Sequence, residues 1–250
     1  MNKFNKKHFS FIICFCLVIF SLIYLIYLIY NKQQSNYLYV DHDISSNAVD
    51  SNYYNDIINN ARNKYNNNEV VGILEIDNTN YIVPIMQADD NEYYLNHTPD
   101  GKQNPIGAVF LDYRVDIDSS KKLLIYGHNS SNIDMPFKIL EEFYDKNYYD
   151  NHKYIEITTS KVKKKYEIFS VYVETNDFSY MDITFNSDDE YLKHIEKLKS
   201  KSMYDTGLNL NSDDEILILQ TCSEHPEYRN YQKKYLLIIL RRVEKWRKWN

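Results

Sequence analysis

Between residues 70 and 243 the chain is a succession of short apolar segments rich in β-branched and aromatic residues, which favour strands. We count about eight, mostly consecutive and separated by polar, turn-forming residues. Only two or three stretches with helical spacing interrupt them. This order favours a barrel or strongly curved sheet over a doubly wound parallel sheet. We therefore expect a mostly β fold, a closed or strongly curved eight-stranded barrel with helical insertions.

The expected strands share apolar runs or alternation bounded by turn residues. They are 70–76, 81–86, 106–113, 122–129, 154–159, 165–173, 216–222 and 234–243. Residues 136–143 have helical spacing. Ser187 followed by Glu190 predicts a capping box that starts a helix before the last two strands.

The N-terminal part contains an uncharged, apolar run over residues 9–30. As a helix it would span roughly 33 Å, enough to cross a bilayer. Basic residues at 3, 6 and 7 precede it and predict a cytoplasmic N-terminus with the rest of the chain outside. A cleaved signal peptide is the competing interpretation, but the run is long and lacks a small-residue cleavage site.

These observations predict four parts of the chain. They are a cytoplasmic tail (1–8), a transmembrane signal anchor (9–30), a polar stalk (31–68) and an extracellular catalytic domain (69–250). Within the stalk, residues 48–65 have apolar residues at helical spacing. They form either a short amphipathic helix that packs on the domain or a solvated, partly disordered connection.

Cys222 ends the apolar segment 216–222, and a cysteine there has rigid support yet opens onto a polar loop. The other two cysteines, Cys14 and Cys16, lie within the apolar run. The exported part therefore has one thiol and no internal disulfide. A free extracellular thiol favours a reactive role, although a strand-end cysteine can also be a small buried hydrophobe.

Six histidines lie in the exported part, and His128 is distinctive because it lies just past the apolar residues of the expected strand 122–129. Two neighbouring strands that end on one rim of a barrel would bring His128 and Cys222 together. A thiol nucleophile needs such a base to activate it and to protonate the leaving amine. The other histidines lie in the stalk, in polar loops or on a helix face.

Cys222 and His225 have the Cys-x-x-His spacing of half a zinc site, but no second pair of ligands is present. We therefore expect no metal site and no cofactor. The formal net charge of −6, from 29 basic and 35 acidic residues, gives no indication of a polyanion-binding protein, and we expect no nucleic-acid partner.

Several segments together resemble the sortase family, and its class B branch in particular. Residues 219–222 (Leu-Gln-Thr-Cys) resemble the Thr-Leu-x-Thr-Cys signature, with Ile218 at the position of its first threonine. Residues 126–129 (Tyr-Gly-His-Asn) resemble the catalytic-histidine segment. Residues 81–95 and 107–114 resemble class B segments, and the resemblance covers about 70–243.

The resemblance implies a membrane-anchored cysteine transpeptidase of a Gram-positive cell surface. Such an enzyme cleaves a C-terminal sorting signal, of the Asn-Pro-x-Thr type in this branch, after threonine through a thioacyl intermediate. It then joins the protein to a cell-wall peptide amine. By this resemblance Cys222 is the nucleophile and His128 the general acid and base. From the same segments we expect substrate contacts from Leu219, Thr221, Tyr126, Asn129 and Glu224.

The family also implies an arginine that stabilises the oxyanion, normally at the start of the strand after the cysteine loop. Here that strand begins with Lys233 and Lys234. Arg229 is the nearest arginine and our prediction for the role, with Arg241, Arg242 or one of the lysines as alternatives. A lysine would supply charge without the planar two-pronged donor of a guanidinium.

Two other functions stay open at this stage. A membrane-tethered cysteine endopeptidase or hydrolase would keep the nucleophile and change the acceptor. A non-catalytic surface-binding module would use the abundant tyrosines, 25 in all, and would bury Cys222.

Overall fold

The computed structural model describes residue 15 and residues 17–27 and 52–243. The chain divides into two compact units, Met1–Tyr37 and Leu38–Asn250. In the first unit, residues 17–27 are helical.

The predicted membrane segment 9–30 lies only partly within the described residues, and the predicted tail 1–8 lies wholly outside them. Across residue 15 and ranges 17–27 and 52–243, no helix is both long enough and apolar enough to cross a bilayer. Residues 31–51 of the predicted stalk are likewise outside the described part.

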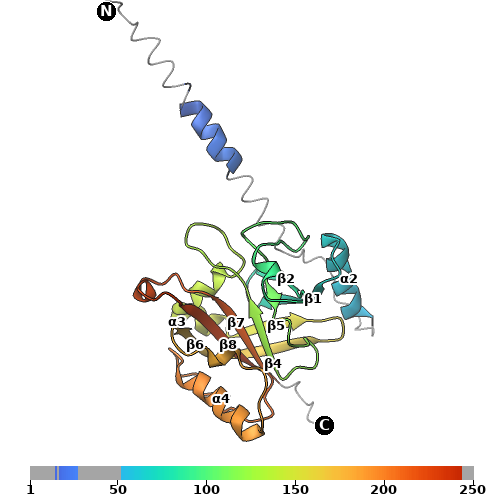
Figure 1. Cartoon of the computed structure of the whole chain (residues 1–250), viewed down its shortest axis with the longest axis vertical. Helices are drawn as coiled ribbons and strands as arrows, with labels where there is room; N and C mark the ends of the chain where they lie inside the picture. The colour runs from blue at the N-terminus through green and yellow to red at the C-terminus, as the bar shows by residue number, and fades with distance from the viewer. Residues whose placement is uncertain (1–14, 16, 28–51, 244–250) are drawn as a thin grey trace, which may run out of the picture. The chain divides into compact units, whose positions relative to one another are not determined.

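Eight strands within residues 52–243 close into one barrel, as the sequence predicts (Figure 1). The strands are β1 (Val70–Ile76), β2 (Ile82–Met86), β3 (Phe110–Leu111), β4 (Lys122–Tyr126), β5 (Tyr154–Thr158), β6 (Lys163–Glu174), β7 (Ile216–Cys222) and β8 (Tyr235–Arg242). Their order around the barrel is β1-β2-β3-β4-β7-β8-β6-β5.

Most neighbouring strands pair antiparallel, but β2–β3 and β4–β7 are parallel. A parallel pair cannot be joined by a tight hairpin and needs a long crossover. The crossover from β4 to β7 contains β5, β6 and the helix α4. It brings the two strands side by side with their carboxyl ends at one rim of the barrel.

The helical elements occupy the connections between strands. They are α2 (Tyr53–Tyr65), η1 (Tyr93–Leu95), η2 (Lys138–Tyr144), α3 (Lys146–Asn151), η3 (Phe178–Met181), α4 (Asp188–Ser200) and η4 (Pro226–Tyr228), where η marks a 3-10 helix. The predicted cap of α4 is confirmed, because the Ser187 side chain accepts a hydrogen bond from the Glu190 amide at 3.1 Å. Figure 1 shows α2 and α4 outside the barrel, on different sides of it.

Helix α2 packs on the barrel rather than standing free. Its buried residues are Ile58, Ala61 and Tyr65. The Arg62 Nε donates to the Val70 carbonyl at 3.0 Å, which ties the helix to the first residue of β1. Asn66 ends the helix in the left-handed conformation, which asparagine adopts at relatively low cost.

Strand β7 shows how the two sides of the barrel wall differ. Side chains alternate along a strand. Leu217 and Leu219 pack in the cluster that fills the barrel, whereas Ile216 and Ile218 pack in a second cluster that includes α2 and α4 on the outside. Both faces of β7 are therefore apolar, which explains its continuous apolar sequence.

Two predicted strands are shorter in the structure. The segment expected at 106–113 is extended only at Phe110–Leu111, because Gly107 turns the backbone with a φ of +66°. The segment expected at 122–129 ends at Tyr126. The residues that follow β4, Gly127 and His128, lie near Cys222.

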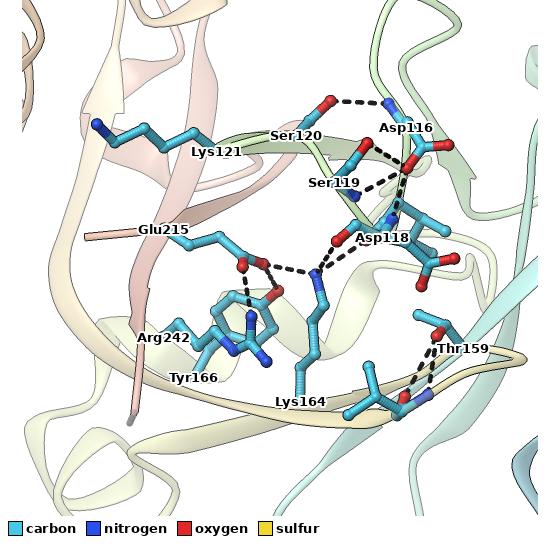
Figure 2. A network of polar contacts seen from close by, with 12 residues as sticks. Asp116, Asp118, Ser119, Ser120, Lys121, Thr159, Lys164, Tyr166, Glu215 and Arg242 are labelled. Atoms are coloured by element: carbon cyan, nitrogen blue, oxygen red, sulfur yellow. Dashed lines mark hydrogen bonds and ion pairs between the residues drawn. The ribbon is translucent and has the colours of Figure 1, made fainter. Parts of the chain in front are cut away.

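A polar network closes the end of the barrel opposite Cys222. Figure 2 shows Lys164, Tyr166 and Arg242 converging on the carboxylate of Glu215, just before β7. The Lys164 Nζ lies 2.8 Å from Glu215 and also donates to two backbone carbonyls, although the lysine is only 2% exposed. A buried ammonium needs such partners, so the network stabilises this end of the fold.

Candidate functional site

Cys222 is the last residue of β7, and its side chain is exposed to solvent. Alternation along the strand puts it on the outer face of the barrel wall, on the same side as Gln220. It lines a pocket of about 300 Å³. The lining residues are Asn91, Leu95, Phe110, Tyr126, Gly127, His128, Met181, Gln220, Thr221, Cys222 and Tyr235.

The parallel β4–β7 pair brings His128 to the same pocket. Tyr126 at the end of β4 lies opposite Gln220 on β7. His128 lies two residues after Tyr126, and Cys222 lies two residues after Gln220. The Gly127 amide donates to the Gln220 carbonyl at 3.2 Å and so continues the pairing beyond the strand. The expectation that neighbouring strands end at one rim is therefore confirmed.

A hydrogen bond to the Leu95 carbonyl orients the imidazole of His128. The Nε2 atom lies 2.7 Å from that oxygen. A carbonyl only accepts, so Nε2 carries the proton and Nδ1 of the neutral ring remains an acceptor. Gly107 lies directly against this ring, since an added Cβ would be 3.1 Å from His128 Cδ2.

The Cys222 thiol is neutral in the resting site. Desolvation by its surroundings raises the pKa of Cys222 above the usual value, and the nearby Glu224 carboxylate raises it further. The ammonium of Lys234 acts in the opposite direction, without reversing the shift. Cys222 therefore needs a base to become a nucleophile at neutral pH.

Asn129 and Glu141 hold the backbone on the C-terminal side of Cys222. The Asn129 Nδ2 donates to the Cys222 carbonyl at 2.9 Å and to Glu141 Oε1 at 2.8 Å. The same Glu141 oxygen accepts from the Glu224 amide at 2.8 Å. Asn129 is buried, so in this arrangement its amide orients the cysteine loop and does not face the pocket.

Leu219 and Thr221 point to the other side of the wall from Cys222. Leu219 is fully buried in the cluster that fills the barrel. The Thr221 hydroxyl donates to the Gly127 carbonyl at 2.8 Å. Leu219 does not line the pocket, whereas Thr221 is among the lining residues although its hydroxyl is bound to the Gly127 carbonyl. Glu224 is exposed, and Tyr126 lines the pocket.

Gln220 is a pocket residue that the sequence analysis did not single out. Its Oε1 accepts a hydrogen bond from the Tyr180 hydroxyl at 2.7 Å. Counting back two residues from Cys222 would have placed Gln220 on the cysteine's face. Met181, Leu95 and Asn91 come from distant loops, and no local pattern indicated them.

A buried carboxylate, Asp112, orients one wall of the pocket. It accepts from Tyr126 at 2.8 Å, from Arg114 at 2.7 and 2.8 Å, and from Asn91 at 3.0 Å. Burial alone would raise the pKa of Asp112, but the hydrogen bonds from Arg114 and Tyr126 outweigh it and lower the pKa. Arg114 also donates to the Met181 carbonyl at 3.2 Å, which links the pocket wall to η3.

The arginine expected at the site is not among the residues that line the pocket within 52–243. Arg229 is exposed at the C-terminal cap of η4. Arg241 lies opposite Ile216 and Arg242 contacts Glu215, so both occupy the far end of the barrel. These two alternatives for the role are wrong, because the register of β7 and β8 separates them from Cys222 by the length of the strand.

The two lysines lie nearer to the thiol. Lys233 places its Nζ 5.3 Å from the ring centre of Phe178. The backbone carbonyl of Lys234 accepts from the Ser223 amide at 2.9 Å, and its ammonium acts on the pKa of Cys222. Neither lysine side chain lines the pocket.

A larger hollow of about 610 Å³ lies elsewhere, bordered by Arg114, Lys122 and the start of α4. It contains neither Cys222 nor His128. Among residues 17–27 and 52–243, no group of three or more His, Cys, Asp and Glu side chains is arranged to hold a metal ion. The His225 ring instead lies 4.6 Å from that of Tyr144.

Comparison with known proteins points to sortases. The family model described as the sortase domain matches residues 74–239. Sortase B of Listeria monocytogenes is 30% identical over 163 residues, which are 65% of this chain and 66% of that protein. Sortase B of Staphylococcus aureus is 28% identical over 159 residues, 63% of this chain and 65% of that protein. The aligned regions thus span slightly less than two thirds of either relative.

The fold comparison agrees. The solved structure of Clostridium perfringens sortase B matches with a TM-score of 0.66 and 27% identity, covering 74% of this chain and 99% of that chain. The similarity to class B sortases predicted from the sequence is confirmed.

Proposed function

The chain belongs to the sortase family, and on that premise we propose that it is a cysteine transpeptidase with Cys222 as nucleophile and His128 as general acid and base. The observation that carries the proposal is that these two side chains line one pocket from adjacent parallel strands. Support also comes from the exposure of Cys222, since a nucleophile must be reachable.

The proposed first half-reaction begins with a neutral thiol. His128 Nδ1 takes the proton as Sγ attacks the carbonyl carbon of the scissile peptide bond. A carbon–sulfur bond forms and the carbonyl π electrons move to oxygen. When this intermediate collapses, the carbon–nitrogen bond breaks and the imidazolium gives its proton to the leaving amine. The product is a thioester on Cys222.

In the second half-reaction an incoming amine attacks the thioester, and His128 accepts its proton. The carbon–sulfur bond breaks with its electron pair leaving on the Cys222 sulfur, the imidazolium returns a proton to that sulfur, and an amide forms. The Asn129 amide donates to the Cys222 carbonyl and the Glu141 carboxylate accepts from the Glu224 amide, and both contacts support the two steps because they hold the nucleophile in one geometry.

For the substrate we propose a C-terminal sorting signal of the Asn-Pro-x-Thr type, cleaved after threonine. The pocket combines apolar side chains such as Leu95 and Met181 with the amides of Asn91 and Gln220. Such a surface suits a proline ring next to an asparagine amide. For the acceptor we propose a cell-wall peptide amine, with residues 9–30 as a membrane tether that places the domain at the cell surface.

The test is to incubate the full-length chain with a fluorogenic Asn-Pro-x-Thr peptide, with and without an amine acceptor. Wild-type protein should cleave the peptide and form the amide adduct, which mass spectrometry identifies. Cys222→Ala and His128→Gln should lose at least a thousandfold in rate. His152→Gln is the matched control, because His152 caps α3 away from the pocket and should leave the rate unchanged.

Other outcomes of this experiment would favour an alternative or contradict the proposal. Cleavage without any adduct would favour the hydrolase alternative. No cleavage by wild-type protein, or equal cleavage by Cys222→Ala, would contradict the transpeptidase mechanism. The binding-module alternative assumed a buried cysteine, whereas Cys222 is exposed.

A further inference from the structure

The pocket beside Cys222 needs a hydrogen-bond donor for the oxygen that becomes negative during attack on a carbonyl. No arginine or lysine side chain lines the pocket within residues 52–243. The residues that line the pocket therefore offer no lysine or arginine donor for that oxygen.

Tyr235 lies directly across from Cys222. The first residue of β8 pairs with the last residue of β7 in the antiparallel register. Side chains opposite each other in such a pair point to the same face, with Cβ atoms about 4.5–5.5 Å apart. Tyr235 accordingly lines the pocket with Cys222.

The neighbouring aromatic residues hold the Tyr235 ring but leave its hydroxyl uncommitted. Phe178 contacts the ring edge to face, with ring centres 5.9 Å apart and an interplanar angle of 74°. Two other tyrosines near the thiol use their hydroxyls, Tyr126 to Asp112 and Tyr180 to Gln220. Within the described part of the chain, the Tyr235 hydroxyl has no hydrogen-bond partner, so it is available to a ligand.

The protonation state of Tyr235 suits a donor. Partial burial raises the pKa of the phenol, and the proximity of Cys222 raises it further. The hydroxyl therefore keeps its proton throughout the neutral range. A phenol beside a developing oxyanion can donate a strong, charge-assisted hydrogen bond.

We propose that Tyr235 is a catalytic residue whose hydroxyl donates a hydrogen bond to the carbonyl oxygen of the acyl donor as Cys222 attacks. The inference rests on the proposed function and deepens it. As the Sγ–carbon bond forms, the π electron pair moves to oxygen, and the Tyr235 O–H stabilises that charge without transferring its proton. On collapse the pair returns, the leaving group departs with its bonding electrons, and the hydrogen bond weakens.

The alternative donors fit less well. Arg229 is exposed on η4 and does not line the pocket. Lys234 immediately precedes Tyr235 and β8, and it is not among the residues that line the pocket. Its ammonium affects the pKa of Cys222 without lining the pocket.

Two reactions of the Cys222 thiol separate oxyanion stabilisation from nucleophile activation. Acylation by p-nitrophenyl acetate passes through a tetrahedral oxyanion, whereas alkylation by iodoacetamide is a direct displacement at carbon and forms none. Both are measured at one pH on the full-length chain. Peptide-resolved mass spectrometry follows Cys222 separately from Cys14 and Cys16.

Tyr235→Phe, which removes only the hydroxyl, should slow acylation about a hundredfold and leave alkylation within about twofold of wild type. With a sorting peptide that wild type cleaves, the loss should appear in kcat more than in KM. Tyr231→Phe is the matched control, because Tyr231 is 47% exposed and outside the pocket. It should change neither rate.

The inference would be overturned if Cys222 in Tyr235→Phe were acylated at the wild-type rate. It would also be overturned if acylation and alkylation slowed equally, because that would indicate loss of positioning or of the thiolate. The ester reaction needs no sorting signal. If wild-type protein fails to cleave the peptide, the proposed function fails while the comparison on the ester still decides the role of Tyr235.

Discussion

The hydroxyl of Thr221 donates a 2.8 Å hydrogen bond to the carbonyl oxygen of Gly127. This contact joins the ends of β7 and β4, one residue before Cys222 and one before His128. The residues that precede the two side chains proposed to act together are thus hydrogen-bonded to each other. The threonine before Cys222 therefore has a structural role, because its hydroxyl binds the backbone next to His128.

Thr221→Val should test this connection, because valine keeps the shape and removes the donor. We expect a loss of about 1 kcal/mol in the free energy of unfolding and about a tenfold lower kcat/KM, since small displacements of reacting groups cost rate. Thr158→Val on β5 is the control and should leave the rate unchanged. Urea unfolding and peptide cleavage measure the two effects. An unchanged rate in Thr221→Val would contradict the role of the contact.

Two nearby groups of opposite charge should shift the pKa of the Cys222 thiol in opposite directions. The Glu224 carboxylate raises the pKa of Cys222 and the Lys234 ammonium lowers it. Glu224→Gln should move the midpoint of the alkylation rate to lower pH, and Lys234→Met should move it to higher pH. Iodoacetamide kinetics across pH 6–10 provide the measurement. Glu227→Gln, on η4, should leave the midpoint in place, and a shift in the wrong direction for either variant would refute the assignment.

Replacement of Gly107 should harm both stability and activity, whereas replacement of Gly207, which also has a positive φ, should affect only stability. Gly107 has a φ of +66°, and an added Cβ would approach the Tyr94 carbonyl oxygen to 2.5 Å and His128 to 3.1 Å. Gly207 has a φ of +65°, with no atom within 4 Å of its Cβ position.

Gly207→Ala should cost about 1–2 kcal/mol from backbone strain alone and leave the rate unchanged. Gly107→Ala should cost more and also lower kcat/KM at least tenfold, because the Leu95–His128 contact must shift. Thermal unfolding and peptide cleavage give the comparison. Equal effects of the two substitutions would show that the clash is unimportant.

The network in Figure 2 should matter for stability and not for the reaction. Glu215→Gln would leave Lys164 buried without its carboxylate, which should lower the free energy of unfolding by about 3–5 kcal/mol. Asp100→Asn breaks the exposed pair with Lys102 and should cost at most about 1 kcal/mol. Below its melting temperature Glu215→Gln should keep the wild-type rate, because roughly 20 Å of strand separates Glu215 from Cys222.

Acid should destabilise the fold through His194 on α4. Burial and then the charge of Lys122, whose Nζ lies 2.7 Å from Nε2, lower the pKa of His194 to about 3 from the 6.5 of a free histidine. Between these values the unfolded chain binds a proton that the native chain does not, so stability falls as the pH falls.

His194→Gln keeps an acceptor for Lys122 but cannot titrate. As the pH is lowered from 6 to 4, the free energy of unfolding of this variant should therefore fall less steeply than that of wild type, by up to about 1.4 kcal/mol per pH unit. Urea unfolding at several pH values measures the slopes. Parallel slopes for the two proteins would mean that His194 is not the titrating group.

Much of the fold was predictable because its signals are local. The apolar alternation of β5 and β6 and the capping box at Ser187 each lie within a few residues of sequence. The strand expected at 106–113 was overestimated for the opposite reason. Gly107 turns the backbone against the Tyr94 carbonyl and the His128 ring, and no nearby residue signals that close approach.

For the site, the sequence by itself determined that Cys222 and His128 each follow an apolar strand, because the patterns that indicate a strand and a polar loop each lie within a few consecutive residues. Only the tertiary structure decided that β4 and β7 are parallel neighbours and that Tyr235 lies across from Cys222. The first relation depends on packing between residues about 90 positions apart along the chain, and the second depends on the register of the β7–β8 pair. The search for an arginine near Cys222 in sequence therefore led to Arg229, whereas the residue across the strand from the thiol is a tyrosine.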